Sequence, residues 1–301
     1  MTEEALEIVM TQQQSTRFYV GIDGGGSTCR ARVADAKGTC LGEGVSGSAN
    51  LRLGVEHSLQ SIRQCTQEAL KQAGLPHIAL SELNAGIGLA GLVLKTDHAV
   101  AAPIRSLFHA CQLTNDAYIA CLGAHKGQYG GVVIIGTGSC AQIISAKESR
   151  TFGGWGLTLA DQASGSWLGR EAMRLALLAT EHLMPSSPLT EALSAPFNHE
   201  AEALFQWSLT AKPADYAQLA PQVFQLAQAQ EPNAQHLIHS ACLDLIRLIQ
   251  TLERYQTGRI ALLGGLAQLY QPYLPHEIQA LLTPPQGNAL EGALLMAWCC
   301  E

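Results

Sequence analysis

The stretch Val20-Gly21-Ile22-Asp23-Gly24-Gly25-Gly26-Ser27-Thr28 decides how this chain is interpreted. An apolar run ends in one carboxylate, and three glycines and two hydroxyl side chains follow. A tight hairpin turn needs one or two glycines, so three exceed what a turn alone requires. Glycines let backbone N–H groups approach a ligand closely, and a carboxylate beside a phosphate requires a cation between them. Mg²⁺ with phosphate is the natural pair, although a decorated tight turn remains the alternative at this point.

The composition indicates a globular chain of two domains. The chain has 301 residues, of which 47% are hydrophobic and 14% charged, and this length favours two cores. The net charge of −7 argues against a nucleic-acid or anionic membrane surface. No apolar run approaches the roughly 20 residues of a membrane helix. Residues 1–16 carry no signal-peptide pattern and are interpreted as a poorly ordered lead-in.

The cysteines favour a reducing compartment. There are nine of them, an odd number, and no Cys-x-x-Cys pair occurs. Without a secretion signal, free thiols in the cytoplasm are expected, and neither a disulfide framework nor a zinc site is supported. The ten histidines include no His-x-x-x-His pair.

The opening pattern occurs twice. Strands are predicted over residues 18–23 and 28–34, and a helix over about 54–73. Val132-Val133-Ile134-Ile135-Gly136-Thr137-Gly138-Ser139-Cys140 then repeats the order of strand, glycine turn, hydroxyl and strand. This repeat predicts two similar domains, each opening with a phosphate-type hairpin. Residues from about 165 to 256 are predicted to be mostly helical, and a buried strand is predicted to end at Gly264-Gly265.

The two glycine loops match neither of two other nucleotide motifs. No Gly-Lys-[Ser/Thr] follows the first loop, so it is not a Walker A loop, and neither loop has the GxGxxG spacing of the dinucleotide fingerprint. With Ser46-Gly47-Ser48-Ala49-Asn50 and Gly153-Gly154-Trp155-Gly156, the chain resembles the sugar kinase, actin and heat-shock chaperone ATPase superfamily. Within it, residues from about 18 to 298 resemble the N-acetylglucosamine kinase and glucosamine kinase branch, which is grouped with the benzoyl-CoA reductase type ATPases.

The resemblance implies an α/β fold of two ribonuclease-H-like (actin-like ATPase) domains with a central cleft. The N-terminal domain is then expected over residues 17–120 plus 285–301. The C-terminal domain, with a helical insertion, is expected over residues 121–284.

The resemblance also assigns the cofactors, which are ATP and Mg²⁺. Asp23 would hold Mg²⁺, through water. The ATP and phosphate contacts are expected from Gly24, Gly25, Gly26, Ser27, Thr28, Gly136, Thr137, Gly138, Ser139, Gly264 and Gly265.

Asp116 is the expected catalytic base. It follows Thr114 and Asn115 at the start of a predicted helix, so a helix cap is the simpler interpretation of its position. The resembling kinases nevertheless place their general base at this position, and one base with one metal site suffices for phosphoryl transfer. The expected sugar contacts are Asn50, Thr137, Gly138, Trp155 and Asp161.

The expected activity is transfer of the γ-phosphoryl group of ATP to the 6-hydroxyl of N-acetyl-D-glucosamine. Glucosamine is the alternative substrate, because the motifs resemble both kinds of kinase. Two other classes stay open: an ATPase that activates a reductase through an iron–sulfur cluster shared by a homodimer, and a sensing protein without turnover. The expected partners are the amino sugar and ATP, without nucleic acid or membrane, and a homodimer is left open. The function of Glu291 is left open: the resemblance places it in the closing helix, and a solvated helix residue is the alternative.

Overall fold

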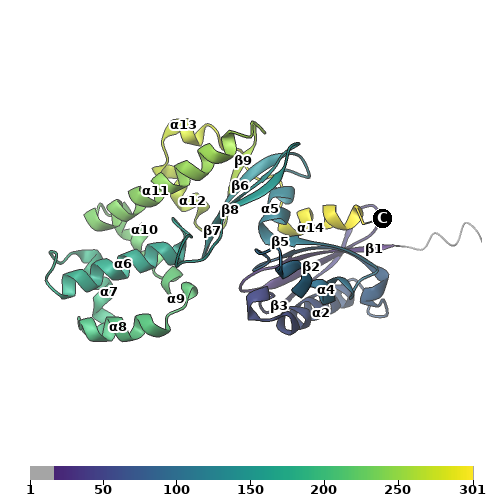
Figure 1. The fold of residues 1–301 in the computed structure, drawn as a ribbon, viewed down its shortest axis with the longest axis horizontal. Helices are drawn as coiled ribbons and strands as arrows, with labels where there is room; N and C mark the ends of the chain where they lie inside the picture. The colour runs from purple at the N-terminus through teal and green to yellow at the C-terminus, as the bar shows by residue number, and fades with distance from the viewer. Residues whose placement is uncertain (1–16, 301) are drawn as a thin grey trace, which may run out of the picture. The chain divides into compact units, whose positions relative to one another are not determined.

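A computed structural model describes residues 17–300, which divide into two compact units. The first unit ends at Gln128 and resumes at Gln286, and the second comprises Tyr129–Pro285. Each unit has its own β-sheet and its own helices (Figure 1), which confirms the predicted pair of α/β domains. The predicted lead-in, residues 1–16, lies outside the described residues.

The sheet of the first unit has five strands in the order β3-β2-β1-β4-β5. β1 pairs antiparallel with β2 and parallel with β4, and β5 extends the parallel side. The last five residues of β1 are buried, so Asp23 lies at the buried end of the central strand. The strands are β1 (Phe18–Gly24), β2 (Cys29–Ala34), β3 (Cys40–Ser46), β4 (Leu83–Leu89) and β5 (Ala110–Asn115).

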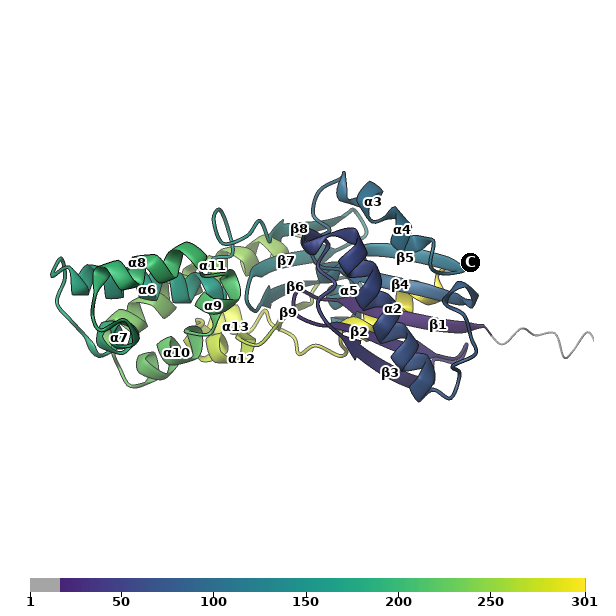
Figure 2. The same ribbon diagram turned by 90° about the horizontal axis from the view of Figure 1, so that it is seen from below.

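Helices cover both faces of this sheet (Figures 1 and 2). α2 (Val55–Gln72) packs on β2 and β3, while α14 (Ala289–Trp298) packs on β1 and β4 beside α5 (Asp116–Ala124). α14 lies so close to β1 that a Cβ on Gly21 would stand 2.7 Å from the carbonyl oxygen of Leu290. The C-terminal helix therefore belongs to the core of the first unit. Two short helices, α3 (Asp97–Val100) and α4 (Ala102–Arg105), lie between β4 and β5 in the chain.

The second unit repeats the hairpin on a smaller sheet of order β8-β7-β6-β9. β6 pairs antiparallel with β7 and parallel with β9, as β1 does with β2 and β4. The helices between β8 and β9 form the apolar core together with the sheet. The strands are β6 (Gly130–Ile135), β7 (Ser139–Ile144), β8 (Ser149–Gly153) and β9 (Ile260–Leu263).

The helical insertion begins at Gly165 and its long closing helix ends at Glu253, within the range predicted to be mostly helical. Prolines start four of its helices at the first or second position, where the missing N–H costs no hydrogen bond. Among residues 17–300, no helix is long and apolar enough to cross a membrane. The helices of this unit are α6 (Gly165–Thr180), α7 (Pro188–Ser194), α8 (Ala201–Thr210), α9 (Pro213–Ala217), α10 (Ala220–Gln228), α11 (Pro232–Glu253), α12 (Ala267–Tyr270) and α13 (His276–Gln279).

Two of the four edge strands, β5 and β8, were not predicted from the sequence. β5 has the sequence ACQLTN, in which only Leu113 is buried, and three of the five residues of β8 are exposed. Neither strand shows the alternation that marks a half-buried strand. Backbone pairing with β4 and β7 therefore defines these strands, and their own side chains do not.

We expect Gly21→Ala to destabilise the first unit, because its new methyl group would press on the backbone of α14. Overpacking of a core contact of this kind typically costs about 1–3 kcal/mol in the free energy of unfolding. Gly47→Ala is the matched control, since a Cβ there meets nothing within 4 Å. Denaturant unfolding of both variants provides the measurement. Equal stability of the two would contradict the close packing of α14 on β1.

Candidate functional site

The first glycine loop connects β1 and β2 and presents an exposed tip. The loop is closed by a hydrogen bond from the N–H of Gly25 to the carbonyl oxygen of Thr28, at 2.9 Å. Gly26, Ser27 and Thr28 are exposed, while Asp23 just before the loop is only 8% exposed. The loop therefore offers small residues and hydroxyl groups to a ligand above a buried carboxylate.

Asp23 is paired with Arg30, a residue that the sequence analysis did not single out. The two residues are directly opposite each other in the β1–β2 pairing, and Nη2 of Arg30 lies 2.7 Å from Oδ2 of Asp23. The Arg30 side chain is half-exposed, so the pair reaches from the buried end of β1 to solvent. Counting outward from the glycine turn across the predicted hairpin would have placed Arg30 opposite Asp23.

Asp116 lies at the first position of α5, and Asn115 is the residue that caps this helix. Oδ1 of Asn115 accepts a hydrogen bond from the N–H of Tyr118 at 2.8 Å. Oδ1 of Asp116 accepts one from the N–H of Ala117 at 2.9 Å. Burial and, after it, the negative charge of Asp23 raise the pKa of Asp116, against the lowering effect of backbone N–H groups. The cap function belongs to Asn115, and the function of Asp116 as base stays a prediction.

Asn50 is held against the first glycine loop by backbone hydrogen bonds of its neighbours. The N–H of Ala49 donates to the carbonyl oxygen of Gly25 at 3.1 Å, and the N–H of Ala90 to that of Gly24 at 2.7 Å. The N–H of Leu51 donates in turn to the carbonyl oxygen of Ala90 at 2.9 Å. The segment predicted to contact sugar and the first glycine loop thus form one hydrogen-bonded structure.

The second glycine loop connects β6 and β7 and rests on the N-terminus of α6. The N–H groups of Gly165 and Ser166 donate to the carbonyl oxygens of Gly136 and Thr137, at 2.8 and 3.1 Å. The hydroxyl of Ser139 donates to the carbonyl oxygen of Gln162 at 2.7 Å. Thr137 at the tip is exposed. The carbonyl groups of the loop therefore face inward, as those of the first loop do.

Asp161 is buried beneath the second loop. Its backbone has φ +61°, a left-handed conformation that a residue other than glycine rarely adopts. Burial raises the pKa of Asp161, and the backbone N–H groups of Ser139 and Gly156 oppose this effect. A Cβ on Gly138 would stand 2.9 Å from Oδ2 of Asp161. The carboxylate is thus a packing partner of the second loop as well as a predicted sugar contact.

Trp155 is held away from the apolar core. It is 60% exposed, and the glycines around it, Gly153, Gly154 and Gly156, all have positive φ, at 71°, 72° and 86°. A loop of this conformation presents the indole ring to solvent, where it can cover an apolar group of a ligand.

Gly264 and Gly265 follow β9, and they differ in whether the fold requires a glycine at that position. Gly264 has φ +93°, and a Cβ there would collide with the carbonyl group of Ile135. Both glycines are exposed, and a Cβ on Gly265 would meet nothing within 4 Å. Gly264 is therefore required by the fold itself, whereas Gly265 leaves open space beside the backbone.

The predicted site residues fall into two sets, one on each unit. The first unit holds Asp23, Gly24, Gly25, Gly26, Ser27, Thr28, Asn50 and Asp116, and the second holds Gly136, Thr137, Gly138, Ser139, Trp155, Asp161, Gly264 and Gly265. Among the residues that the structure describes, no group of three or more His, Cys, Asp or Glu side chains is arranged to hold a metal ion.

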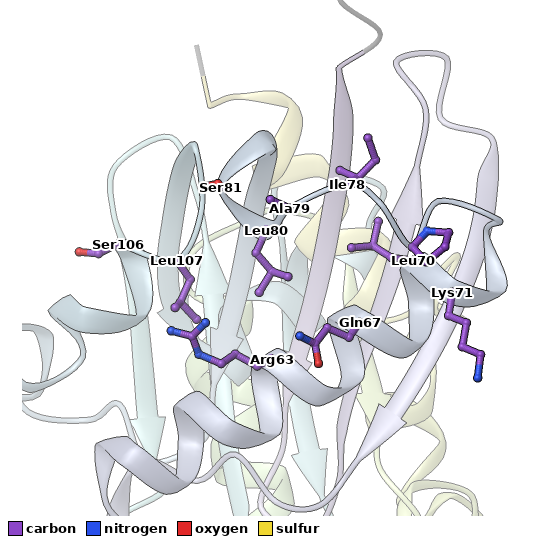
Figure 3. A pocket seen from close by; sticks show the side chains of 11 residues that line it. Arg63, Gln67, Leu70, Lys71, Ile78, Ala79, Leu80, Ser81, Ser106 and Leu107 are labelled. Carbon is purple, nitrogen blue, oxygen red and sulfur yellow. The ribbon is translucent and has the colours of Figure 1, made fainter.

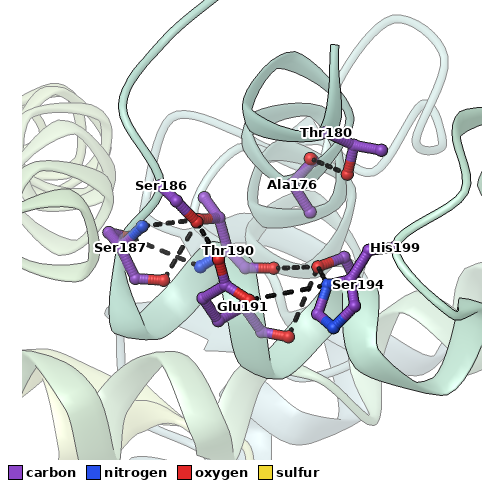
Figure 4. A network of polar contacts seen from close by, with 8 residues as sticks. All are labelled: Ala176, Thr180, Ser186, Ser187, Thr190, Glu191, Ser194 and His199. Carbon is purple, nitrogen blue, oxygen red and sulfur yellow. Dashed lines mark hydrogen bonds and ion pairs between the residues drawn. The ribbon is translucent and has the colours of Figure 1, made fainter. Parts of the chain in front are cut away.

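Two surface hollows contain none of the predicted site residues. One, of about 620 Å³, lies along α2 and includes Arg63 and Lys71 (Figure 3). The other, of about 640 Å³, is next to a polar network around His199 (Figure 4). Oγ of Ser194 lies 2.7 Å from Nδ1 of His199, and a carboxylate oxygen of Glu191 lies 3.5 Å from the same nitrogen. A catalytic triad needs the serine and the carboxylate on different ring nitrogens, so this network is not one.

The comparisons with known proteins agree with the fold. Residues 20–297 match the BadF/BadG/BcrA/BcrD ATPase family, and the chain belongs to this family. Its two domains are ribonuclease-H-like, as the sequence predicted. Membership of an ATPase family implies that the protein uses ATP with Mg²⁺.

Three proteins that are named as amino-sugar kinases resemble the chain. The chain is 37% identical over 280 residues to the glucosamine kinase GspK of Vibrio cholerae. The alignment covers 93% of this chain and 95% of that protein. It is 26% identical over 262 residues to the N-acetyl-D-glucosamine kinase of Dictyostelium discoideum, covering 79% of this chain and 80% of that protein. A crystal structure from Chromobacterium violaceum, provisionally named an N-acetylglucosamine kinase, has a TM-score of 0.87 and 34% identity over 94% of this chain and 99% of that chain.

The residues present fit ATP and Mg²⁺. The tip of the first loop is exposed, and the adjacent Asp23 would supply one of the one or two carboxylates with which Mg²⁺ binds beside phosphate groups. In the second unit, a Cβ on Gly136 or Gly265 would meet nothing within 4 Å, so neither glycine is needed for packing. The open space at both positions is available to a nucleotide.

We expect the carboxyl group of Asp116 to titrate above the ordinary Asp pKa of about 3.9, because burial and Asp23 both disfavour its charged form. Asp23→Asn removes one negative charge and should lower the pKa of Asp116. Arg30→Gln leaves the charge of Asp23 unbalanced and should raise it. The carboxyl ¹³C shift of Asp116, assigned by its loss in Asp116→Asn, provides the measurement across pH. A pKa that moves in neither variant would contradict the coupling of these groups.

Proposed function

We propose that the protein is an ATP-dependent amino-sugar kinase that phosphorylates the 6-hydroxyl of N-acetyl-D-glucosamine. The observation that carries the proposal is Asp116, a half-buried carboxylate that is not needed to cap α5 and whose pKa is raised. A carboxylate with a raised pKa is a stronger base, as removal of a hydroxyl proton requires. The likeness to a glucosamine kinase and an N-acetylglucosamine kinase supports the class of substrate.

In the proposed reaction the 6-hydroxyl oxygen bonds to the γ-phosphorus of ATP, the bond to ADP breaks, and the hydroxyl proton passes to Asp116. Asp23 would hold Mg²⁺ through water, and the bound ion would neutralise phosphate charge. Arg30 keeps the Asp23 carboxylate in one position through its 2.7 Å contact. The exposed loop tips, which include Ser27 and Thr137, would contact phosphate groups.

We assign the sugar contacts to residues predicted from the sequence. Asn50 would bind sugar hydroxyl groups, and Thr137, Gly138 and Asp161 are assigned as further sugar contacts. Trp155 would cover the methyl of the acetyl group, and its exposure leaves the ring face available for this. The adenine and ribose are assigned to Gly264 and Gly265.

Glucosamine is the second candidate substrate, and a different observation favours it. The Vibrio cholerae relative that covers 93% of this chain is a glucosamine kinase. Free glucosamine is largely cationic near neutral pH, so its amino group requires a carboxylate partner. Asp161 could serve, but it is only 8% exposed, it interacts with backbone N–H groups, and burial raises its pKa. These features make Asp161 a poor partner for a cation, and they favour the neutral N-acetyl sugar.

A coupled ADP-release assay with glucose, glucosamine, N-acetylglucosamine and N-acetylmannosamine tests the proposal. N-acetylglucosamine should give the highest kcat/KM, and ³¹P NMR should identify the 6-phosphate. Asp116→Asn should lose about 10²–10⁴-fold in kcat, which is typical for a positioned base. No turnover with any sugar would refute the kinase assignment, and a coloured protein that hydrolyses ATP alone would favour a reductase-activating ATPase.

We expect Trp155→Ala to lower kcat/KM for N-acetylglucosamine at least about tenfold, equivalent to about 1.4 kcal/mol. Kinetics with glucosamine should change much less, because that sugar has no acetyl group to cover. Leu159→Ala is the control, since Leu159 is in the same loop and is 82% exposed. Equal losses on both sugars, or a wild-type preference for glucosamine, would instead support the second candidate.

A further inference from the structure

The loop that follows β4 is fastened by one buried carboxylate. The chain turns at Gly91, which has φ +81°, and continues to Asp97 at the start of α3. Oδ2 of Asp97 accepts hydrogen bonds from the N–H groups of Val93 and Leu94, at 2.9 and 2.6 Å. Asp97 is only 5% exposed, so these bonds are shielded from water.

The same oxygen atom is paired with Arg52 from another segment. Nη2 of Arg52 lies 2.5 Å from Oδ2 of Asp97, and the Arg52 side chain is half-exposed. Burial alone would raise the pKa of Asp97, but the N–H groups of Leu94 and Val93 and the charge of Arg52 together lower it. The carboxylate therefore stays charged and links the loop to Arg52.

Arg52 connects this carboxylate directly to Asn50. The backbone N–H of Arg52 donates to Oδ1 of Asn50 at 2.9 Å. Oδ1 also lies so close to Gly91 that no Cβ would fit there. Asn50 is thus held by Arg52 on one side and by the turn at Gly91 on the other, and Asp97 fastens both. The side-chain nitrogen Nδ2 of Asn50 lies 4.0 Å from the position that a Cβ on Gly26 would take, beside the first glycine loop.

We propose that Asp97, acting through Arg52, is a positioning residue that fixes the orientation of Asn50 for sugar binding. The inference rests on the proposed function for the contact between Asn50 and the sugar, but the position of Asn50 itself is independent of it. Because Asp97 fastens both segments that surround Asn50, loss of its charge would free the side chain to rotate. Sugar affinity would then fall while nucleotide binding is retained.

Asp97→Asn is the main test, because the amide is nearly isosteric and can still accept the two backbone hydrogen bonds. The KM for the amino sugar should rise about tenfold, while the KM for ATP and the melting temperature stay near wild type. Arg52→Gln should act similarly, and the double variant should add little to either, as expected of partners in one network. Arg52→Lys should recover most of the sugar affinity.

Glu43→Gln is the matched control, because it breaks another arginine–carboxylate ion pair of the same unit, with Arg32 at 2.6 Å. It should leave the KM for the sugar unchanged. An unchanged sugar KM in both Asp97→Asn and Arg52→Gln would overturn the proposal. So would a parallel rise of both KM values with a lower melting temperature, which indicates general loosening.

Hydrogen exchange separates this proposal from the proposed function. The amide of Arg52, which donates to Asn50, should exchange faster in Asp97→Asn than in wild type, without any substrate present. If wild type phosphorylates no amino sugar but this exchange increases, the proposed function fails and the anchoring of Asn50 by Asp97 stands. If the exchange does not change, the anchoring is refuted whichever sugar is used.

Discussion

The first unit is organised around a negative charge at the buried end of its central strand. A carboxylate there is costly unless it is paired, because burial removes the water that would stabilise it. Arg30 supplies the pairing from the adjacent strand, at 2.7 Å. The negative charge of Asp23 also helps to raise the pKa of Asp116. One charge at the end of β1 thus relates the proposed metal ligand to the proposed base.

In both glycine loops, backbone carbonyl oxygens accept hydrogen bonds, but the donors come from different parts of the fold. In the first loop, the carbonyl groups of Gly24 and Gly25 accept N–H groups from Ala90 and Ala49. In the second, the carbonyl groups accept N–H groups from the first turn of α6. Both arrangements direct the negative ends of the peptide dipoles inward. A phosphate group at either tip would then avoid repulsion by these carbonyl oxygens, as the proposed function requires.

The sequence predicted those parts whose chemistry is local. The glycine loops, the long helix α2 and the paired α/β domains follow from hydrophobic periodicity and glycine placement, which neighbouring residues record. The edge strands β5 and β8 could not be predicted in this way, because their hydrogen bonds come from other segments. Arg30 was missed although the register of the predicted hairpin places it opposite Asp23. Asp97 could not be predicted, because its partner Arg52 is 45 residues away in the sequence and an isolated charged residue gives no local signal.

Asp161 shows how a site residue can also be a structural one. Its left-handed backbone and its contact with Gly138 make it part of the second loop, and the N–H groups of Ser139 and Gly156 partly balance its charge. A carboxylate already balanced in this way gains little from a substrate cation, but its free lone pairs can still accept hydrogen bonds from sugar hydroxyl groups. Its charge is therefore balanced within the protein, and under the proposed function the choice between amino sugars would depend on what covers the nitrogen substituent. In the second unit, Trp155 is the exposed aromatic side chain next to this loop.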